Sequence, residues 1–289
     1  MSLRFETPAR SLVLPRHWQY KLSNLRTGLT NWHDRRIDRS AASFFAAMKR
    51  SGADYDAHID ALPRHGLIYV CVPKCASTSI KIALSALQGE TVAPHLAHKR
   101  RYSALRSPSQ VGVSGFHRLA LDPKTLCFTF VRNPYARLVS TWADKFRNKP
   151  LVPGDRFVDR YLAHRDVADR QQPIGPDKTL SFARFVIFAI ETLGTQPDPH
   201  WQLQSELTDV PGLPLGLIGK VESFAQDFRE VLAHAGGPAA QRLLTLPVSN
   251  VTQHGPWQGF YTAELAERVR RAYAEDFTRF GYATRLEGA

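Results

Sequence analysis

Two apolar runs without polar alternation predict strands that are covered on both faces of a sheet. Residues 67–72 read Leu-Ile-Tyr-Val-Cys-Val, and residues 126–131 read Leu-Cys-Phe-Thr-Phe-Val. After each run, apolar residues recur at the spacing of an amphipathic helix. They are Ile80, Ala83, Leu84 and Leu87 after the first run, and Tyr135, Leu138, Val139, Trp142 and Phe146 after the second. This order of strands and helices predicts an α/β fold with a central parallel sheet flanked by helices.

The rest of the pattern extends the same architecture. Residues 182–193 predict a strongly apolar helix, and residues 215–219 predict a short strand. A further helix is expected from Ser223, as its cap, to about residue 235, where two glycines end it. The last helix is expected from about residue 262 to residue 280. We expect one domain over residues 56–289, preceded by a basic arm or helical lead-in over residues 1–55.

The turn after the first strand contains Lys74, Ser77, Thr78 and Ser79. The unpaired N–H groups of a helix start, its dipole, an ammonium and several hydroxyls would meet there, which favours a polyanion. The turn is not a nucleotide P-loop, because it has no glycine and its lysine comes first. The alternative is an ordinary turn in which Thr78 caps the helix and Lys74 is solvated.

The second strand is followed at once by Arg132, and Ser140 lies two turns into the next helix. Pro134 suits the first turn of that helix, where its missing N–H has no cost. Ligands of open α/β sheets bind at the carboxyl ends of the strands, and a guanidinium binds phosphate through two hydrogen bonds. Taken singly, Arg132 is also compatible with a surface ion pair and Ser140 with a plain helix-face serine.

Together, the segments 72–81 and 130–140 resemble the two signature loops of PAPS-dependent family 2 sulfotransferases. The closest resemblance is to the carbohydrate enzymes that act on chondroitin, dermatan and the HNK-1 glycan, and it extends over residues 56–284. It implies a P-loop-NTPase-like sulfotransferase fold. It also implies that the first loop binds the 5′-phosphosulfate of 3′-phosphoadenylyl sulfate (PAPS), through Lys74, Cys75, Ala76, Ser77, Thr78 and Ser79. Arg132 and Ser140 would bind the 3′-phosphate.

The implied reaction transfers a sulfuryl group to a hydroxyl of a glycan, with 3′-phosphoadenosine 5′-phosphate (PAP) as the product and no metal. Lys74 would stabilise the leaving phosphate. A histidine is the expected base. His117 is favoured because the resemblance places it before the second loop, and His200 is second. Trp201 is suited to stacking on a sugar. His117 and Trp201 are therefore the expected contacts with the substrate. Glu206 is a more remote candidate for the base.

A polar segment late in the chain, residues 248–257, is expected to close over the nucleotide, as a late loop does in the resembled fold. The candidates for donor contacts in it are Asn250, Thr252, Gln253 and His254.

Charge and cysteine content bear on partners and compartment. The net charge is +12, and residues 1–50 hold ten Arg or Lys against three Asp or Glu. Two interpretations of this basic segment stay open: a solvated surface, or a face that meets an anionic acceptor. Nucleic-acid binding is not expected, because no binding motif accompanies the charge. Peripheral membrane contact is compatible with it. The chain shows no signal peptide or transmembrane run, and its three cysteines do not suggest a disulfide scaffold.

We therefore expect a soluble, cytoplasmic enzyme, in contrast to the membrane-anchored Golgi enzymes that it resembles. Cys75 as a nucleophile is an alternative that an activated donor makes unnecessary. Two other functions stay open at this point. One is a nucleotide-dependent kinase, although the glycine loop and an acidic metal site are missing from the pattern. The other is a non-catalytic binder of nucleotides or anionic glycans.

Overall fold

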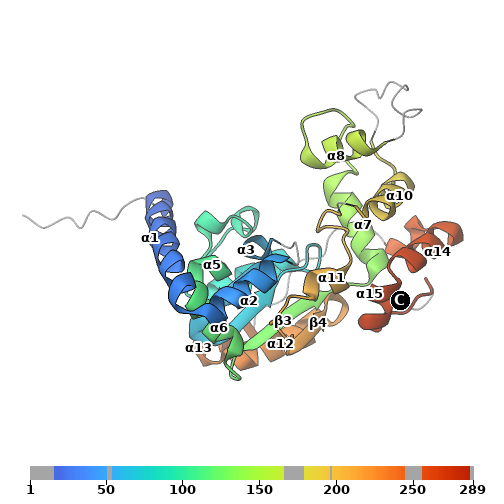
Figure 1. The fold of residues 1–289 in the computed structure, drawn as a ribbon. Coiled ribbons are helices and arrows are strands. Elements are labelled where there is room, and N and C mark those ends of the chain that lie inside the picture. The colour runs from blue at the N-terminus through green and yellow to red at the C-terminus, as the bar shows by residue number, and fades with distance from the viewer. Residues whose placement is uncertain (1–15, 51–53, 166–178, 196, 245–255, 287–289) are drawn as a thin grey trace, which may run out of the picture.

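The computed structural model describes residues 16–50, 54–165, 179–195, 197–244 and 256–286. Helices outnumber strands in this part of the chain (Figure 1). The helices and strands are, in order, α1 Arg16–Ile37, α2 Arg39–Arg50, α3 Tyr55–His58, β1 Ile59–Leu62, β2 Leu67–Val70, α4 Ser77–Leu87, α5 Pro108–Val111, α6 Val113–Leu121, β3 Leu126–Val131, α7 Pro134–Lys145, α8 Arg156–His164, α10 Phe182–Thr192, α11 Gln204–Thr208, β4 Leu217–Lys220, α12 Phe224–Ala235, α13 Gly237–Leu244, α14 Ala263–Ala272 and α15 Ala274–Arg279. Short 3₁₀ turns lie at Pro63–His65, Pro94–Leu96, Arg100–Tyr102, Val221–Ser223 and Trp257–Phe260.

The four strands form one sheet in the order β1-β2-β3-β4. β2, β3 and β4 are parallel, with Val70 beside Thr129 and Val131 beside Lys220. The carboxyl ends of β2 and β3 therefore lie at one edge, as expected. The predicted α/β fold is confirmed, with one correction, since the edge strand β1 runs antiparallel to β2.

The two faces of the sheet are covered by different helices. Leu67 and Tyr69 of β2 belong to a core cluster with residues of α4, α12 and α13. Ile68 and Val70 belong to a cluster with residues of α2 and α6. Because successive side chains of a strand point to opposite faces, these helix groups lie on opposite sides. This arrangement explains why β2 reads as a continuous apolar run.

A third core cluster lies among helices alone, in the lobe at the right of Figure 1. It is formed by α7, α8, α10, α14 and α15, around the buried ring of Trp201. α7 starts directly beyond β3 and ends in this lobe, so it connects the sheet edge to the helical layer.

The last predicted helix is two helices in the structure. α14 ends at Ala272 and α15 begins at Ala274, with Tyr273 between them at φ −108° and ψ 23°. The Tyr273 side chain is buried, and its hydroxyl donates to the carbonyl oxygen of Trp201 at 2.6 Å. The break between α14 and α15 therefore coincides with the contact between Tyr273 and Trp201, which lies outside this segment. The helical spacing of residues 262–280 does not predict it.

The described part of the basic lead-in, residues 16–50, packs against the domain through α2. Ala41, Phe45 and Met48 of α2 are buried in the cluster on the β1 and β2 face. The boundary at residue 55 stays a prediction, but the core does not stop there.

Candidate active site

The first anion loop makes its turn without glycine. Lys74 and Ala76 adopt φ values of 69° and 57°, the left-handed region that disfavours residues with a Cβ. Each such residue costs roughly 1–2 kcal/mol. The turn ends at Ser77, where α4 begins, so the N–H groups of the first helical turn lack intrahelical partners. Surrounding contacts must maintain this strained shape.

One of those contacts is a buried guanidinium. The Nε of Arg137 donates to the carbonyl oxygen of Pro73 at 3.1 Å. Its Nη1 and Nη2 donate to the carbonyl oxygens of Gln202 at 2.6 Å and Pro199 at 2.7 Å. Arg137 is almost fully buried on α7. It ties the first loop to the segment that carries His200.

A second contact joins the two anion loops. The buried Gln204 side chain accepts through Oε1 from the Cys75 thiol at 3.2 Å and from the Arg132 N–H at 2.9 Å. Its Nε2 donates to the Arg132 carbonyl oxygen at 2.8 Å. Asp276 accepts from the Gln204 N–H at 2.8 Å. One amide therefore fixes the loop after β2 relative to the loop after β3.

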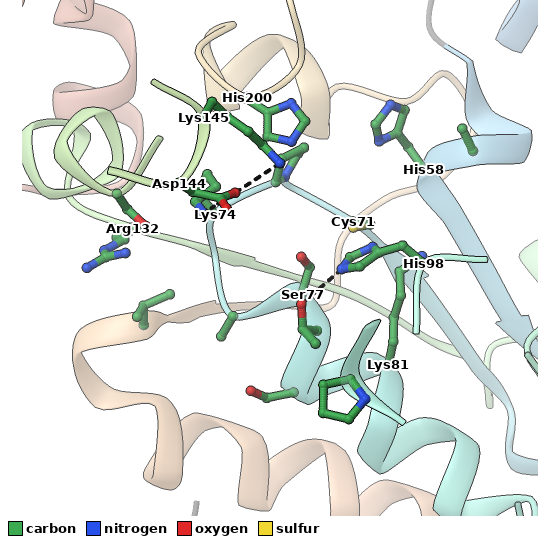
Figure 2. A pocket seen from close by; sticks show the side chains of 18 of the residues that line it. His58, Cys71, Lys74, Ser77, Lys81, His98, Arg132, Asp144, Lys145 and His200 are labelled. Carbon is green, nitrogen blue, oxygen red and sulfur yellow. Dashed lines mark hydrogen bonds and ion pairs between the residues drawn. The ribbon is translucent and has the colours of Figure 1, made fainter. Parts of the chain in front are cut away.

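The loops open into a pocket of about 1090 Å³ (Figure 2). Most of the residues that the sequence suggests for the donor line it: Lys74, Ala76, Ser77, Thr78, Ser79, Arg132 and Ser140. Of the two histidines proposed as base, His200 lines it as well. The pocket is thus built at the carboxyl edge of the sheet, between α4 and α7.

The cationic groups of the pocket differ in their partners. The Lys74 ammonium lies 3.0 Å from Asp144 Oδ2, and Lys145 lies 2.9 Å from the same oxygen. Burial lowers the pKa of Lys74, and Asp144 opposes that shift. Burial alone would raise the pKa of Asp144, but the two ammonium groups hold it at about 2. An arriving anion would compete with this carboxylate for Lys74.

Arg132 differs from these lysines because its charge is not paired with a carboxylate of the described residues. Among the described residues, its guanidinium has neither a hydrogen bond nor an ion pair, and burial lowers its pKa. The Ser140 hydroxyl, on the wall of the same pocket, also has no partner in the described part of the chain. A half-buried cation beside a free hydroxyl is a site for an oxyanion.

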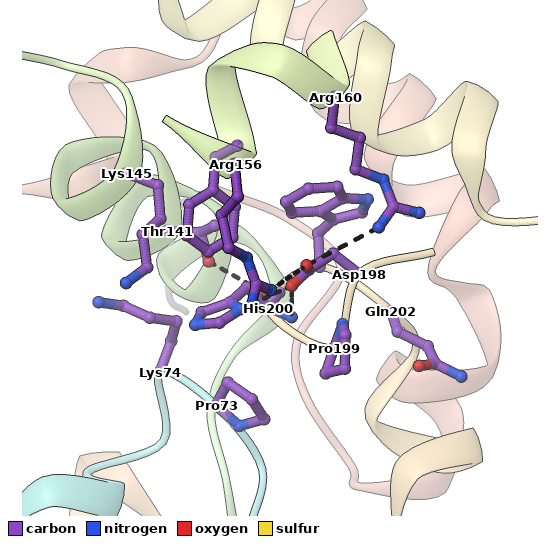
Figure 3. A network of polar contacts seen from close by, with 12 residues as sticks. Pro73, Lys74, Thr141, Lys145, Arg156, Arg160, Asp198, Pro199, His200 and Gln202 are labelled. Carbon is purple, nitrogen blue, oxygen red and sulfur yellow. Dashed lines mark hydrogen bonds and ion pairs between the residues drawn. The ribbon is translucent and has the colours of Figure 1, made fainter. Parts of the chain in front are cut away.

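His200 is held by a carboxylate (Figure 3). Its Nδ1 lies 2.6 Å from Asp198 Oδ1, and Thr141 donates to its carbonyl oxygen at 2.9 Å. Asp198 also accepts from Arg156 at 2.7 Å, so its charge is shared. Burial lowers the pKa of His200 despite Asp198. Its imidazole is therefore largely neutral near pH 7, with Nδ1 engaged and Nε2 remaining for a substrate.

The pocket contains two more histidines that no sequence pattern predicts. His98 Nε2 lies 2.9 Å from the Thr78 hydroxyl, and burial lowers the pKa of His98 to about 4. His58 also lines the pocket, and burial lowers its pKa too. Lys81 also lines the pocket, paired with the buried Asp60 at 2.9 Å. No local motif marks these residues, although Lys81 lies one turn after the loop hydroxyls.

Three candidate side chains do not lie where their suggested roles require. His117 does not line the pocket; it lies on α6, where its ring packs against Phe44 with 5.1 Å between ring centroids. Trp201 is fully buried, and its Nε1 donates to the Thr192 hydroxyl, so it has no face for a sugar. The Cys75 side chain, predicted as a donor contact, is fully buried against Gln204 and does not line the pocket. Burial raises its pKa to about 12, which disfavours the alternative of a nucleophilic thiolate.

Other candidates lie away from the pocket or outside the described residues. Glu206 accepts from Gln202 and does not line the pocket. Asn250, Thr252, Gln253 and His254 all fall in the part of the chain that the structure does not describe. Their proposed donor contacts stay predictions.

Gln204→Leu is expected to lower the free energy of unfolding by about 2–4 kcal/mol, because it leaves the backbone groups of Arg132 buried without partners. Chemical denaturation measures this loss. Gln202→Leu is the matched control, since among the described residues its side chain bonds Glu206 alone, at the surface. An equal loss in both variants would contradict the linking role of Gln204.

Comparison with known proteins agrees with this geometry. Residues 57–283 match the sequence profile of the Sulfotransferase family. Carbohydrate sulfotransferase 11 of Rattus norvegicus is 27% identical over 234 residues, which cover 76% of this chain and 65% of the relative. Carbohydrate sulfotransferase 8 of Mus musculus is 27% identical over 218 residues, 72% of this chain and 52% of the relative. The chain thus spans about two thirds or less of these relatives. No solved structure matches it significantly.

The comparisons correct the expected location. The cytoplasmic location expected from the sequence is wrong on these findings, because the relatives are carbohydrate sulfotransferases and no described feature of the chain indicates the cytoplasm. Every helix in the described residues is too short or too polar to cross a bilayer. Those residues also contain no group of three or more His, Cys, Asp or Glu that would hold a metal.

Proposed function

Because the chain belongs to the Sulfotransferase family, we propose that it transfers a sulfuryl group from PAPS to a hydroxyl of a carbohydrate. The observation that carries this proposal is one pocket with two anion sites held by a shared amide. Lys74 and the start of α4 form the first site, and Arg132 with Ser140 forms the second. The family match does not favour the kinase or the non-catalytic binder.

The pocket suits the donor in charge and size. Its volume slightly exceeds that of most small-molecule sites, which suits a nucleotide with room for an acceptor. The 5′-phosphosulfate would lie on the first loop, against the hydroxyls of Ser77 and Thr78 and the amides of the helix start. The 3′-phosphate would be bound by the guanidinium of Arg132 and the hydroxyl of Ser140.

The transfer step needs a base and a stabilised leaving group. His200 Nε2 would take the proton of the acceptor hydroxyl while that oxygen attacks sulfur. The bond between sulfur and the 5′-phosphate oxygen breaks, and the negative charge that develops on this oxygen is stabilised by the Lys74 ammonium. Asp198 holds the imidazole by its Nδ1 and stabilises the imidazolium that forms.

The acceptor is proposed as a carbohydrate from the names of the relatives, as a polysaccharide, an oligosaccharide or a glycolipid. The pocket is cationic on several walls, through Lys81, Lys145 and Arg132. This charge suits an acidic sugar chain, although the donor is itself a polyanion.

Arg132→Ala tests the donor site by calorimetry. We expect PAP to bind the unaltered protein without Mg²⁺, and the variant to lose about 10- to 100-fold in affinity, because one charged bidentate contact is removed. Arg147→Ala is the control, since it removes the same charge from an exposed position outside the pocket. Binding of Mg-ATP but not of PAP would refute the proposed donor.

A further inference from the structure

Helix α1 contacts the domain through polar side chains. The Asn31 Nδ2 donates to the carbonyl oxygen of Ser109 at 2.8 Å, and its Oδ1 accepts from the Val113 N–H at 2.9 Å. Asp34 Oδ2 accepts from the Ser114 N–H at 3.3 Å. These contacts join α1 to α5 and α6. A surface helix normally packs on the protein through an apolar face. In α1, the face that packs on the domain is polar.

Three apolar side chains of α1 point away from the domain. Leu25, Leu29 and Trp32 are 68%, 74% and 57% exposed. Their spacing of i, i+4 and i+7 places them on one face of the helix, which we call the outer face of α1. In Figure 1, α1 lies at the end of the molecule opposite α8, α10 and α14. An inverted helix of this kind has water against its apolar side, which costs free energy unless something covers it.

Basic residues surround the outer face. α1 contains five Arg or Lys and one acidic residue. Lys21 lies one turn before Leu25, and the guanidinium of Arg36 lies 3.9 Å from the centre of the Trp32 ring. Arg26 and Arg35 are exposed. A helix that lies in the interface of an anionic bilayer has leucine and tryptophan on one face with basic residues beside them. The outer face of α1 has this composition.

We propose that α1 is an interfacial helix that docks this protein on an anionic lipid surface through its outer face. Leu25, Leu29 and Trp32 enter the boundary between headgroups and acyl chains, and the basic residues bind lipid phosphates. A second copy of the chain fits less well. Two such helices would bring like charges together, and three side chains fall far short of the roughly 800 Å² per partner of a stable interface.

Vesicle sedimentation of the full chain tests this docking. We expect binding to vesicles of phosphatidylcholine with 30% phosphatidylglycerol, and much weaker binding to phosphatidylcholine alone. Leu29→Asp should lower the partition coefficient at least about tenfold, because it places a carboxylate in the apolar and anionic interface. Raising NaCl to about 0.5 M should also weaken binding, since the lipid charge is then screened.

The matched control is Leu121→Asp. Leu121 is 65% exposed on α6, and the substitution changes the net charge equally. It should keep vesicle binding within about twofold, so a loss confined to Leu29→Asp separates the outer face from the general positive charge. Equal losses in the two variants, or no binding to anionic vesicles, would overturn the proposal. So would a concentration-dependent dimer that Leu29→Asp dissociates, because the occupant would then be a second copy.

Discussion

Replacing Lys74 with methionine is expected to lower kcat for sulfuryl transfer by about 10²- to 10³-fold. Methionine keeps most of the length and the apolar stem of the side chain but removes the ammonium that would meet the charge developing on the leaving phosphate oxygen. Loss of one preorganised donor to such an oxygen has this size in other enzymes. The KM for the donor should change less than kcat, since most of its contacts with the ground state come from other groups. Transfer of labelled sulfate from PAPS to a glycan panel measures both.

Lys145→Met is the control for Lys74→Met. Both ammonium groups contact Asp144 Oδ2, at 3.0 Å for Lys74 and 2.9 Å for Lys145, but only Lys74 belongs to the loop itself. We expect less than a tenfold loss in kcat for Lys145→Met. Equal losses in the two variants would mean that the positive potential of the pocket matters, and that Lys74 has no specific role at the leaving oxygen.

Replacing His200 with glutamine is expected to lower kcat by about 10²- to 10⁴-fold, the usual contribution of a general base. The pH dependence gives a second readout. Because burial lowers the pKa of His200 from its ordinary 6.5, the neutral base persists below that pH. The rate of the unaltered enzyme should therefore be level above about pH 6.5 and should fall at lower pH, where His200 becomes protonated. In the variant this acidic limb should disappear.

His117→Gln serves as the comparison, because its ring packs against Phe44 on α6 and does not line the pocket. Turnover and the pH profile should match the unaltered enzyme. A large loss of turnover in His117→Gln together with normal turnover in His200→Gln would reverse the assignment of the base.

The fold was predictable where burial leaves a local pattern. The strand at 126–131 was predicted with its observed bounds, because all but one of its side chains are buried and the run is nearly all apolar. β1 was missed. Its four residues include Asp60, which is fully buried against Lys81 and Arg100, and a carboxylate inside a strand resembles a break in the pattern. Only the partners, 21 and 40 residues further along the chain, make that charge compatible with the core.

The site was predictable to the extent that it is local. Arg132 follows β3 directly and Lys74 comes four residues after the end of β2, so parallel pairing alone brings them to one edge. The base depended on where distant helices place their side chains, and His117 and Trp201 point elsewhere. Gln204 and Arg137 were missed for the same reason, since their partners are the backbone groups of other loops.

The amide of Gln204 has a consequence for which nucleotides this pocket accepts. It bonds the Cys75 thiol of one loop and the Arg132 backbone of the other, so the fold fixes the spacing of the two loops. On the proposed donor assignment, this spacing would select ligands by the distance between their charged groups. We then expect a nucleotide with all its phosphates in one chain to match the donor in charge but to leave the Arg132 guanidinium without a phosphate.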